Sequence, residues 1–108
     1  MATIRRPRLL AFQTGIEAQG YSNVFAPSGN VSWEVNSIIV TGPAVLERAF
    51  DTNGDGLFEY FVEVDSVNTA EEFHGFKFQC DQRAGLRVKN AHNSSVLSVF
   101  LLGCEIED

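Results

Sequence analysis

The sequence predicts an all-β fold: a single-domain antiparallel β-sandwich or barrel, with about seven or eight strands and little helix. Apolar and polar residues alternate with a period of two along most of the chain, as they do in half-buried strands. Clusters of Gly, Asn, Asp and Pro interrupt this alternation every 8–12 residues or so, the usual spacing of turns in small β-proteins. The length of 108 residues suits one domain with one core.

The N-terminal segment is basic. We predict that residues 1–12 form an N-terminal arm or edge strand and that residues 13–108 form the sandwich. Pro7 has no N–H group to donate to a sheet ladder, so this segment suits only an edge strand or an extended arm. The positive charge of the segment comes from Arg5, Arg6 and Arg8.

The next part of the chain combines a long loop with a strong strand. Residues 13–30 are rich in Gly, Ser, Asn and Ala, which predicts a loop with room for one short strand. Residues 31–40 predict a strand with Trp33 on its apolar face. The alternation slips by one residue near Ser37, which predicts a β-bulge or a stretch covered on both faces.

The clearest local structure is a hairpin over residues 44–64. Its Asn-Gly and Asp-Gly pairs tolerate the positive φ angles that tight turns require, and strand-forming residues flank them. The second strand alternates an aromatic and aliphatic face with a mostly acidic face, so it is predicted to be half buried. The side predicted to face the core carries Phe58, Tyr60, Val62 and Val64, and the opposite side carries Leu57, Glu59, Phe61 and Glu63.

Three further strands are predicted after a polar loop at residues 65–75. The last strand, residues 96–107, is the longest, and its first half is apolar on both faces. Cys80 and Cys104 lie in strand patterns, where buried free thiols are expected; a disulfide between adjacent strands is the alternative. The predicted core comprises Trp33, Phe58, Tyr60, Phe78, Val88 and Phe100.

The chain carries more apolar strand positions than one core needs. Part of the hairpin and one face of the last strand are in excess, because a small sandwich buries one face of each sheet. A second apolar face predicts contacts within a homo-oligomer, unless residues 13–30 and 65–75 fold over it. The predicted oligomer contacts are Phe61, Leu97, Val99 and Leu101.

The hairpin tip resembles the first nine positions of an EF-hand calcium loop. Asp51, Asn53, Asp55 and Glu59 provide alternate oxygen ligands. The twelfth position, however, is Val62 instead of a bidentate Glu, and strands flank the loop in place of helices. We therefore predict an acidic hairpin tip that holds no metal, with a calcium loop as the alternative.

No constellation in the sequence predicts catalysis. His74 and His92 have no Cys or carboxylate at metal-ligand spacing, and no serine lies in a nucleophile elbow. We therefore expect that the chain is not an enzyme and that it holds no cofactor. A net charge of −6 predicts that nucleic acid is no partner. The absence of a signal peptide pattern and of an apolar run near 20 residues predicts neither secretion nor membrane insertion.

Three segments carry a resemblance to a known family. The order TGPAVLERAFDTNGDGLFEYFVEV, HGFKFQC and GLRVKNAHNSSVLSVFLLGCEIE resembles small jelly-roll decoration, or cement, proteins of tailed bacteriophages. The resemblance covers about two-thirds of the chain and rests on strand rhythm. It implies a virion protein that is assembled in the host cytoplasm and binds the major capsid protein on the capsid exterior, as a homo-oligomer and in particular a trimer. An N-terminal arm would grip the shell through Ile4, Arg5, Arg6 and Arg8.

Two other functions are compatible with the same pattern. A carbohydrate-binding module is also a β-sandwich, but it needs exposed aromatic rings, and Trp33 lies in an apolar alternation. A tail or head-fibre module would have the same strand rhythm as a capsid decoration protein, so the sequence does not separate these two virion locations.

Overall fold

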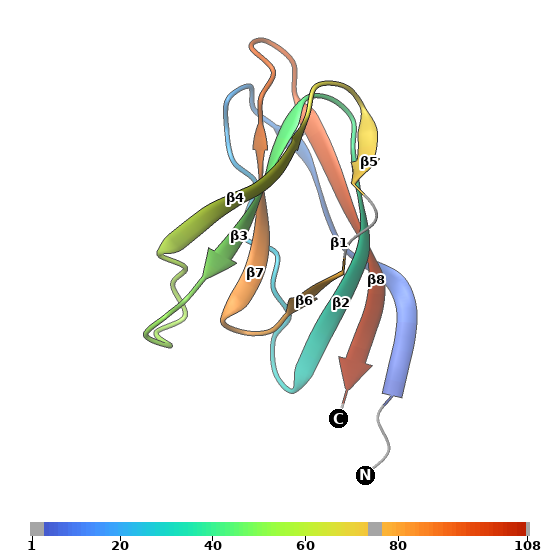
Figure 1. The fold of residues 1–108 in the computed structure, drawn as a ribbon, viewed down its shortest axis with the longest axis vertical. Coiled ribbons are helices and arrows are strands. Elements are labelled where there is room, and N and C mark those ends of the chain that lie inside the picture. Colours follow the sequence, from blue (N-terminus) through green and yellow to red (C-terminus); the bar gives the residue numbers. More distant parts are fainter. Residues whose placement is uncertain (1–3, 74–76, 108) are drawn as a thin grey trace.

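The computed structural model describes residues 4–73 and 77–107, and it confirms the predicted fold class. Within these residues, eight strands form two antiparallel sheets that pack as a β-sandwich, with no helix (Figure 1). Sheet A has the order β1-β8-β2-β5, with β6 also paired to β2, and sheet B has the order β4-β3-β7. The strands are β1 (Ile4–Ile16), β2 (Val31–Val40), β3 (Ala44–Phe50), β4 (Tyr60–Val67), β5 (Glu71–Phe73), β6 (Phe78–Cys80), β7 (Ala84–Asn90) and β8 (Leu97–Glu107).

The strands pair from the two ends of the chain inward, as in one long folded hairpin. β1 pairs with β8, residues 21 and 25 form bridges to β7, β2 pairs with β5 and β6, and β3 pairs with β4. Successive pairs lie alternately in sheet A and sheet B, which is the winding of a jelly roll. The loop between β3 and β4 is the tip of this long hairpin.

The core lies between the inner faces of the two sheets. Trp33 and Val88 are buried there, as predicted, whereas Phe78 and Phe100 are only partly buried. Aliphatic side chains of β2, β3, β7 and β8 fill most of the space, because a two-layer sandwich buries alternate residues of each strand. The fully buried ones include Val35, Ile38, Val40, Leu46, Leu86, Val88, Leu97, Val99 and Leu101.

The face assignment predicted for β8 is therefore wrong. Leu97, Val99 and Leu101 were expected to contact other subunits, but they form the centre of the core and are essentially unexposed. β8 lies between β1 and β2 in the middle of sheet A. Its inner face therefore packs against sheet B in the centre of the sandwich. The opposite face, with Phe100 and Leu102, points outward.

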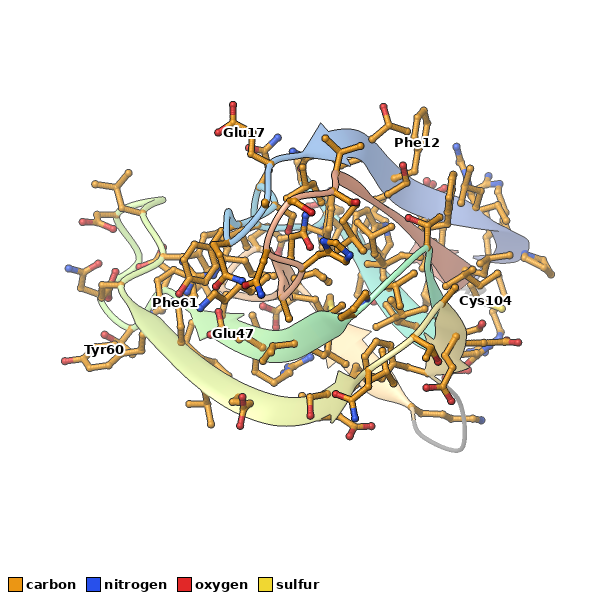
Figure 2. The ribbon with its side chains drawn as sticks, turned by 90° about the horizontal axis from the view of Figure 1, so that it is seen from above. Phe12, Glu17, Glu47, Tyr60, Phe61 and Cys104 are labelled. Carbon is orange, nitrogen blue, oxygen red and sulfur yellow. The ribbon has the colours of Figure 1, made fainter. Side chains whose placement is uncertain are left out.

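The face assignment predicted for β4 is also wrong. Phe58 precedes the strand and is partly buried, while Tyr60, Val62 and Val64 are 59%, 52% and 42% exposed. β4 is an edge strand, and on this side sheet A ends in the three-residue strands β5 and β6. Figure 2 shows Tyr60 pointing away from the body of the protein. An aromatic strand face therefore remains open to solvent.

One predicted local feature is present in the structure, and two strands are longer than the sequence predicted. The register of β2 shifts between Val35 and Ser37, which confirms the predicted bulge. β1 runs past residue 12 to Ile16 as the edge strand of sheet A. One continuous strand therefore crosses the predicted boundary between an N-terminal arm and the sandwich. The predicted polar loop at residues 65–75 instead continues β4 and then contains β5, and its last two residues lie outside the described ones.

Candidate functional site

The outer face of sheet A carries an apolar surface, which we call the outer patch. It consists of Leu9 and Phe12 of β1, Ile39 of β2, and Phe100 and Leu102 of β8. Cross-strand pairing brings them together, since Leu9 pairs with Leu102 and Phe100 lies between Phe12 and Ile39. The Phe12 and Phe100 rings stack with centroids 6.1 Å apart.

The outer patch remains accessible to solvent. The side chains of Phe12, Leu9 and Ile39 are 59%, 43% and 39% exposed, and Figure 2 shows Phe12 pointing outward from β1. Neither residues 13–30 nor residues 65–73 cover these side chains, although the sequence allowed such a cover. A contiguous exposed apolar surface is typical of an interaction site.

Charged groups of opposite sign lie at the two ends of the outer patch. At one end, Glu34 lies between Arg5 and Lys77, with N–O distances of 3.0 Å and 3.7 Å. At the other end lies Glu72, whose carboxylate accepts a hydrogen bond from Ser37 Oγ. The first end therefore has one surplus positive charge, and the second has a negative charge.

The residues expected to contact a capsid lie within β1. Arg5 is on the outer face, whereas Arg6 and Arg8 are on the inner face, because they pair in register with alternate residues of β8. Arg6 forms an ion pair with Glu107 at 3.6 Å, and Arg8 forms one with Glu105 at 3.1 Å. These arginines, together with Ile4, belong to an ordered edge strand whose cations already have carboxylate partners.

Phe61 is on the outer face of sheet B, where it has an intramolecular partner. The Arg87 guanidinium lies 3.5 Å from the centroid of the Phe61 ring and 3.9 Å from that of Tyr21. Two of its three nitrogens, Nη2 and Nε, contact Glu47 Oε1 at 2.6 Å and 2.7 Å. Arg87 therefore holds the segment around Tyr21 against sheet B. The Phe61 ring takes part in this contact within the chain.

The loop between β3 and β4 is organised around the buried carboxylate of Asp51. Its two oxygens accept the N–H groups of Gly54 and Gly56, each at 2.8 Å. Both glycines have positive φ, which allows their N–H groups to converge. Burial alone raises the pKa of Asp51, but the hydrogen bonds from the N–H groups of Gly56, Gly54 and Asp55 and the charge of Arg83 together outweigh burial and lower this pKa from its usual value.

Asp51, Asp55 and Glu59 form an acidic cluster with carboxylate oxygens within 4.8 Å of one another. Each of them accepts an N–H group of the loop, since Asp55 bonds Leu57 N at 2.9 Å and Glu59 bonds Thr52 N at 2.9 Å. The loop is thus held by its own hydrogen bonds. The prediction that it binds no metal still requires a direct test.

Removal of divalent cations is expected to leave stability unchanged. A chelator should shift the midpoint of thermal unfolding by no more than about 1 °C, because a ligand that is not bound contributes nothing to folding. Differential scanning fluorimetry with and without chelator measures this. A rise of about 4 °C or more on adding calcium would instead establish a site at Asp51, Asp55 and Glu59.

The low pKa of Asp51 predicts a defined pH dependence. A carboxylate whose folded pKa lies below its unfolded pKa stabilises the protein above the unfolded value, and this effect is lost as pH falls through the folded value. Asp51→Asn should therefore lower the unfolding midpoint at pH 7, with a difference from the parent chain that shrinks below about pH 4. Unfolding curves between pH 3 and 7 measure it, and a difference that stays constant over this range would contradict the assignment.

The two cysteines lie on opposite faces of sheet A. Cys80 pairs with Trp33 and Cys104 with the adjacent Glu34, and neighbouring residues of a strand point in opposite directions. They are free thiols, so the alternative of a disulfide does not apply. Cys104 is only partly buried, whereas burial raises the pKa of Cys80 to about 11, although the nearby Arg48 opposes this effect.

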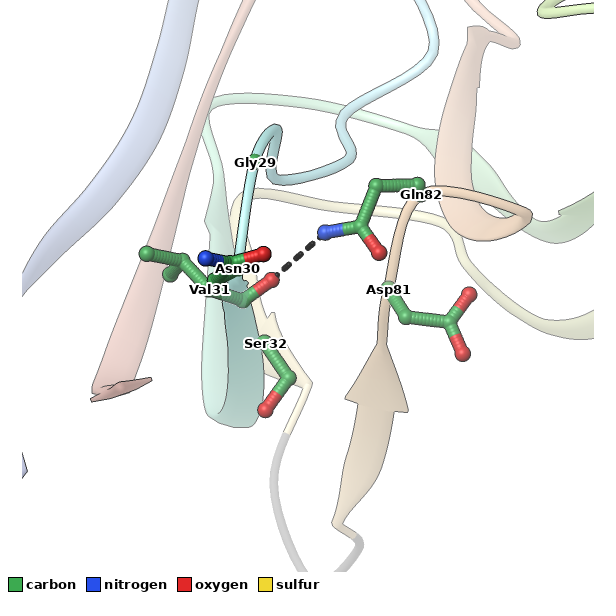
Figure 3. Close-up of a pocket in the computed structure, with 6 residues that line it drawn as sticks. All are labelled: Gly29, Asn30, Val31, Ser32, Asp81 and Gln82. Atoms are coloured by element: carbon green, nitrogen blue, oxygen red, sulfur yellow. Dashed lines mark hydrogen bonds between the residues drawn. The ribbon is translucent and has the colours of Figure 1, made fainter. Parts of the chain in front are cut away.

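A shallow pocket lies where the turn before β2 meets the turn after β6 (Figure 3). Gln82 crosses it and donates a hydrogen bond to Val31 O at 2.7 Å. Its lining combines amide, hydroxyl and carboxylate groups without a histidine or cysteine nucleophile. The residues are Gly29, Asn30, Val31, Ser32, Asp81 and Gln82.

Of the two histidines, only His92 can be placed, because His74 lies outside the described residues. The Nδ1 atom of His92 accepts hydrogen bonds from Ser94 N at 3.0 Å and Ser95 N at 2.9 Å, so His92 orders the turn before β8.

Comparisons with known proteins add no family. Neither a scan against protein-family models nor a search of curated proteins finds a match to this chain. Among the described residues, no helix is long and apolar enough to cross a membrane. The outer patch is the candidate functional surface, because it is a contiguous apolar surface that is exposed to solvent. The sequence showed two apolar faces on the last strand, but long-range pairing determines which of them is exposed.

Proposed function

We propose that this chain is a non-enzymatic viral structural protein, a capsid decoration protein of a tailed bacteriophage. It binds the major capsid protein on the outer shell as a homo-oligomer and stabilises the shell, without nucleic acid or membrane as a partner. The observation that carries the proposal is the outer patch, because a jelly roll with an uncovered apolar sheet face suits assembly more than catalysis. The resemblance of the three strand segments to decoration proteins supports the same conclusion.

The edge strand β1 supplies the capsid contacts in this proposal. Arg5, Arg6 and Arg8 remain 46–54% exposed within their ion pairs. Exposed ion pairs contribute only about 0–1 kcal/mol each, so capsid carboxylates can replace the intramolecular partners at little cost. Several subunits acting together multiply such weak contacts through effective concentration, whatever the number of copies in the oligomer, three or otherwise.

The test uses shells assembled from the major capsid protein of the same source. The intact chain should co-sediment with these shells and raise their thermal disruption temperature. A variant with Arg5, Arg6 and Arg8 all changed to Gln should keep its β1 strand and its oligomeric mass, but bind the shells more weakly. Deleting residues 1–8 would be less informative, because residues 4–8 pair with β8 and contribute to the fold.

The outcomes separate the virion locations and the role of β1. If the triple variant binds shells as tightly as the parent chain, the capsid contacts lie outside β1. No binding of the intact chain to shells, with binding to isolated tails or fibres, would instead identify a tail or head-fibre module.

The second candidate is a carbohydrate-binding module. Trp33 is buried and therefore unable to form a sugar platform, which weakens this reading. The exposed ring of Tyr60 on the open face of β4 is the observation that favours it. Binding on a glycan array that is lost in Tyr60→Ala would support this candidate, and an array without hits would remove it.

A further inference from the structure

The outer patch is the surface on which a second copy of this chain fits best. We propose that two copies pack face to face through their outer patches, related by a two-fold axis, with the strands of the two sheets antiparallel. This inference rests on the proposed function only in that both require self-association. It adds the surface, the symmetry and the charged contacts of the assembly.

The edges of β1 and β4 are poorly suited to pairing between copies. The edge of β1 carries Pro7, three arginines and a register shift around Leu10, all of which hinder the addition of another strand. The edge of β4 carries Glu63 and Asp65, which have no cationic partner among the described residues. A second copy paired edge to edge at β4 would bring these like charges together. The face of sheet A is therefore the better contact.

Charge complementarity selects the antiparallel arrangement. β5 pairs with the C-terminal half of β2 and β6 with its N-terminal half, so Glu72 and Lys77 lie on the same side of β2 but at opposite ends of the patch. We consider a two-fold axis that lies in the plane of the patch and runs perpendicular to the strands. Under this axis each strand of one copy faces the same strand of the other copy, and the two ends of the patch are exchanged. This axis brings Glu72 of each copy to Lys77 of the other. A two-fold axis parallel to the strands would instead place Glu72 of one copy on the β1 side of the other copy, away from its Lys77.

The apolar residues obey the same symmetry. With the axis passing between Phe100 and Leu102, Phe12 of one copy faces Leu9 of the other, and Phe100 faces Leu102. Aromatic rings therefore meet aliphatic side chains across the contact, and the most exposed ring, Phe12, leaves water. Two sheets that pack in this way interdigitate their side chains at a separation of about 10 Å.

The experiment is a charge exchange measured by sedimentation equilibrium of the full chain without capsid. Glu72→Lys replaces two attractive contacts by two repulsive ones and should raise the dimer dissociation constant about 10- to 30-fold. Lys77→Glu should do the same. The double variant should regain the affinity of the parent chain, because each introduced lysine then faces an introduced glutamate of the other copy.

Glu63→Lys is the matched control, because it changes the net charge by the same amount on exposed β4. It should leave the dissociation constant unchanged. The proposal is overturned if the parent chain is a monomer or a trimer, if the double variant is no better than the single ones, or if Glu63→Lys weakens association equally. A dimer that does not bind capsid shells contradicts only the proposed function, and a trimer that binds them contradicts only the two-fold contact. A monomer that binds the shells contradicts the two-fold contact and the homo-oligomer of the proposed function, but not capsid binding itself.

Discussion

Leu101→Ala is expected to lower the free energy of unfolding by about 2–5 kcal/mol. Leu101 is fully buried on central strand β8 and belongs to the core cluster between the two sheets. Its replacement removes apolar contacts and leaves a cavity that the flanking strands β1 and β2 restrict from collapsing. Since small domains have a total stability of roughly 5–15 kcal/mol, chemical unfolding of the variant should show a large shift of the midpoint.

Phe100→Ala is the matched control on the same strand. Phe100 points to the outer patch, so its removal should cost only about 1 kcal/mol of stability. It should instead weaken self-association, which Leu101→Ala affects only through the fold. If the two variants lose equal stability and associate equally well, the assignment of inner and outer faces on β8 is wrong.

The fold class was predictable because it depends on local patterns. Period-two alternation and turn residues identify strands and hairpins without reference to the rest of the chain. The bulge near Ser37 shows the same principle at one residue, since a slip in alternation has to change the register of the strand. The Asn-Gly and Asp-Gly pairs likewise predicted the loop that ends the β3–β4 hairpin.

The exposed faces were not predictable, because they depend on where the other sheet lies. β8 is apolar on both faces in its first half, so the alternation gives no preference between Leu101 and Phe100. On β4, the aromatic face with Tyr60 had the pattern of a buried face. The strand is nevertheless at the edge of sheet B, and sheet A is too short on that side to cover it.

The candidate site depends on contacts between distant segments. The outer patch combines residues near position 10, position 39 and position 101, which the pairing of β1 and β2 with β8 brings together. The contact of Arg87 with Tyr21 and Phe61 is of the same kind, because a loop, β4 and β7 each provide one side chain. Neither arrangement has a local sequence signal.

Gly103→Ala is expected to cost about 3 kcal/mol or more, through steric conflict in the pairing of β2 with β8. A Cβ atom at Gly103 would lie 1.9 Å from Glu34 O and 3.0 Å from Val35 Cα. These are backbone atoms beside the β2 bulge, so they are unable to rotate away as a flexible side chain does. The two strands would have to separate at the centre of sheet A, which carries both the core and the outer patch.

Gly42→Ala provides the control for this prediction. The Cβ atom at Gly42 would meet only the Leu97 side chain, at an ordinary contact distance of 3.6 Å, so its effect should stay within about 0.5 kcal/mol. Chemical unfolding compares the two variants, and self-association should decline only in Gly103→Ala, because this variant alone disturbs the strands beneath the outer patch. Equal unfolding midpoints for the two variants would show that β2 and β8 do not approach each other closely at Gly103.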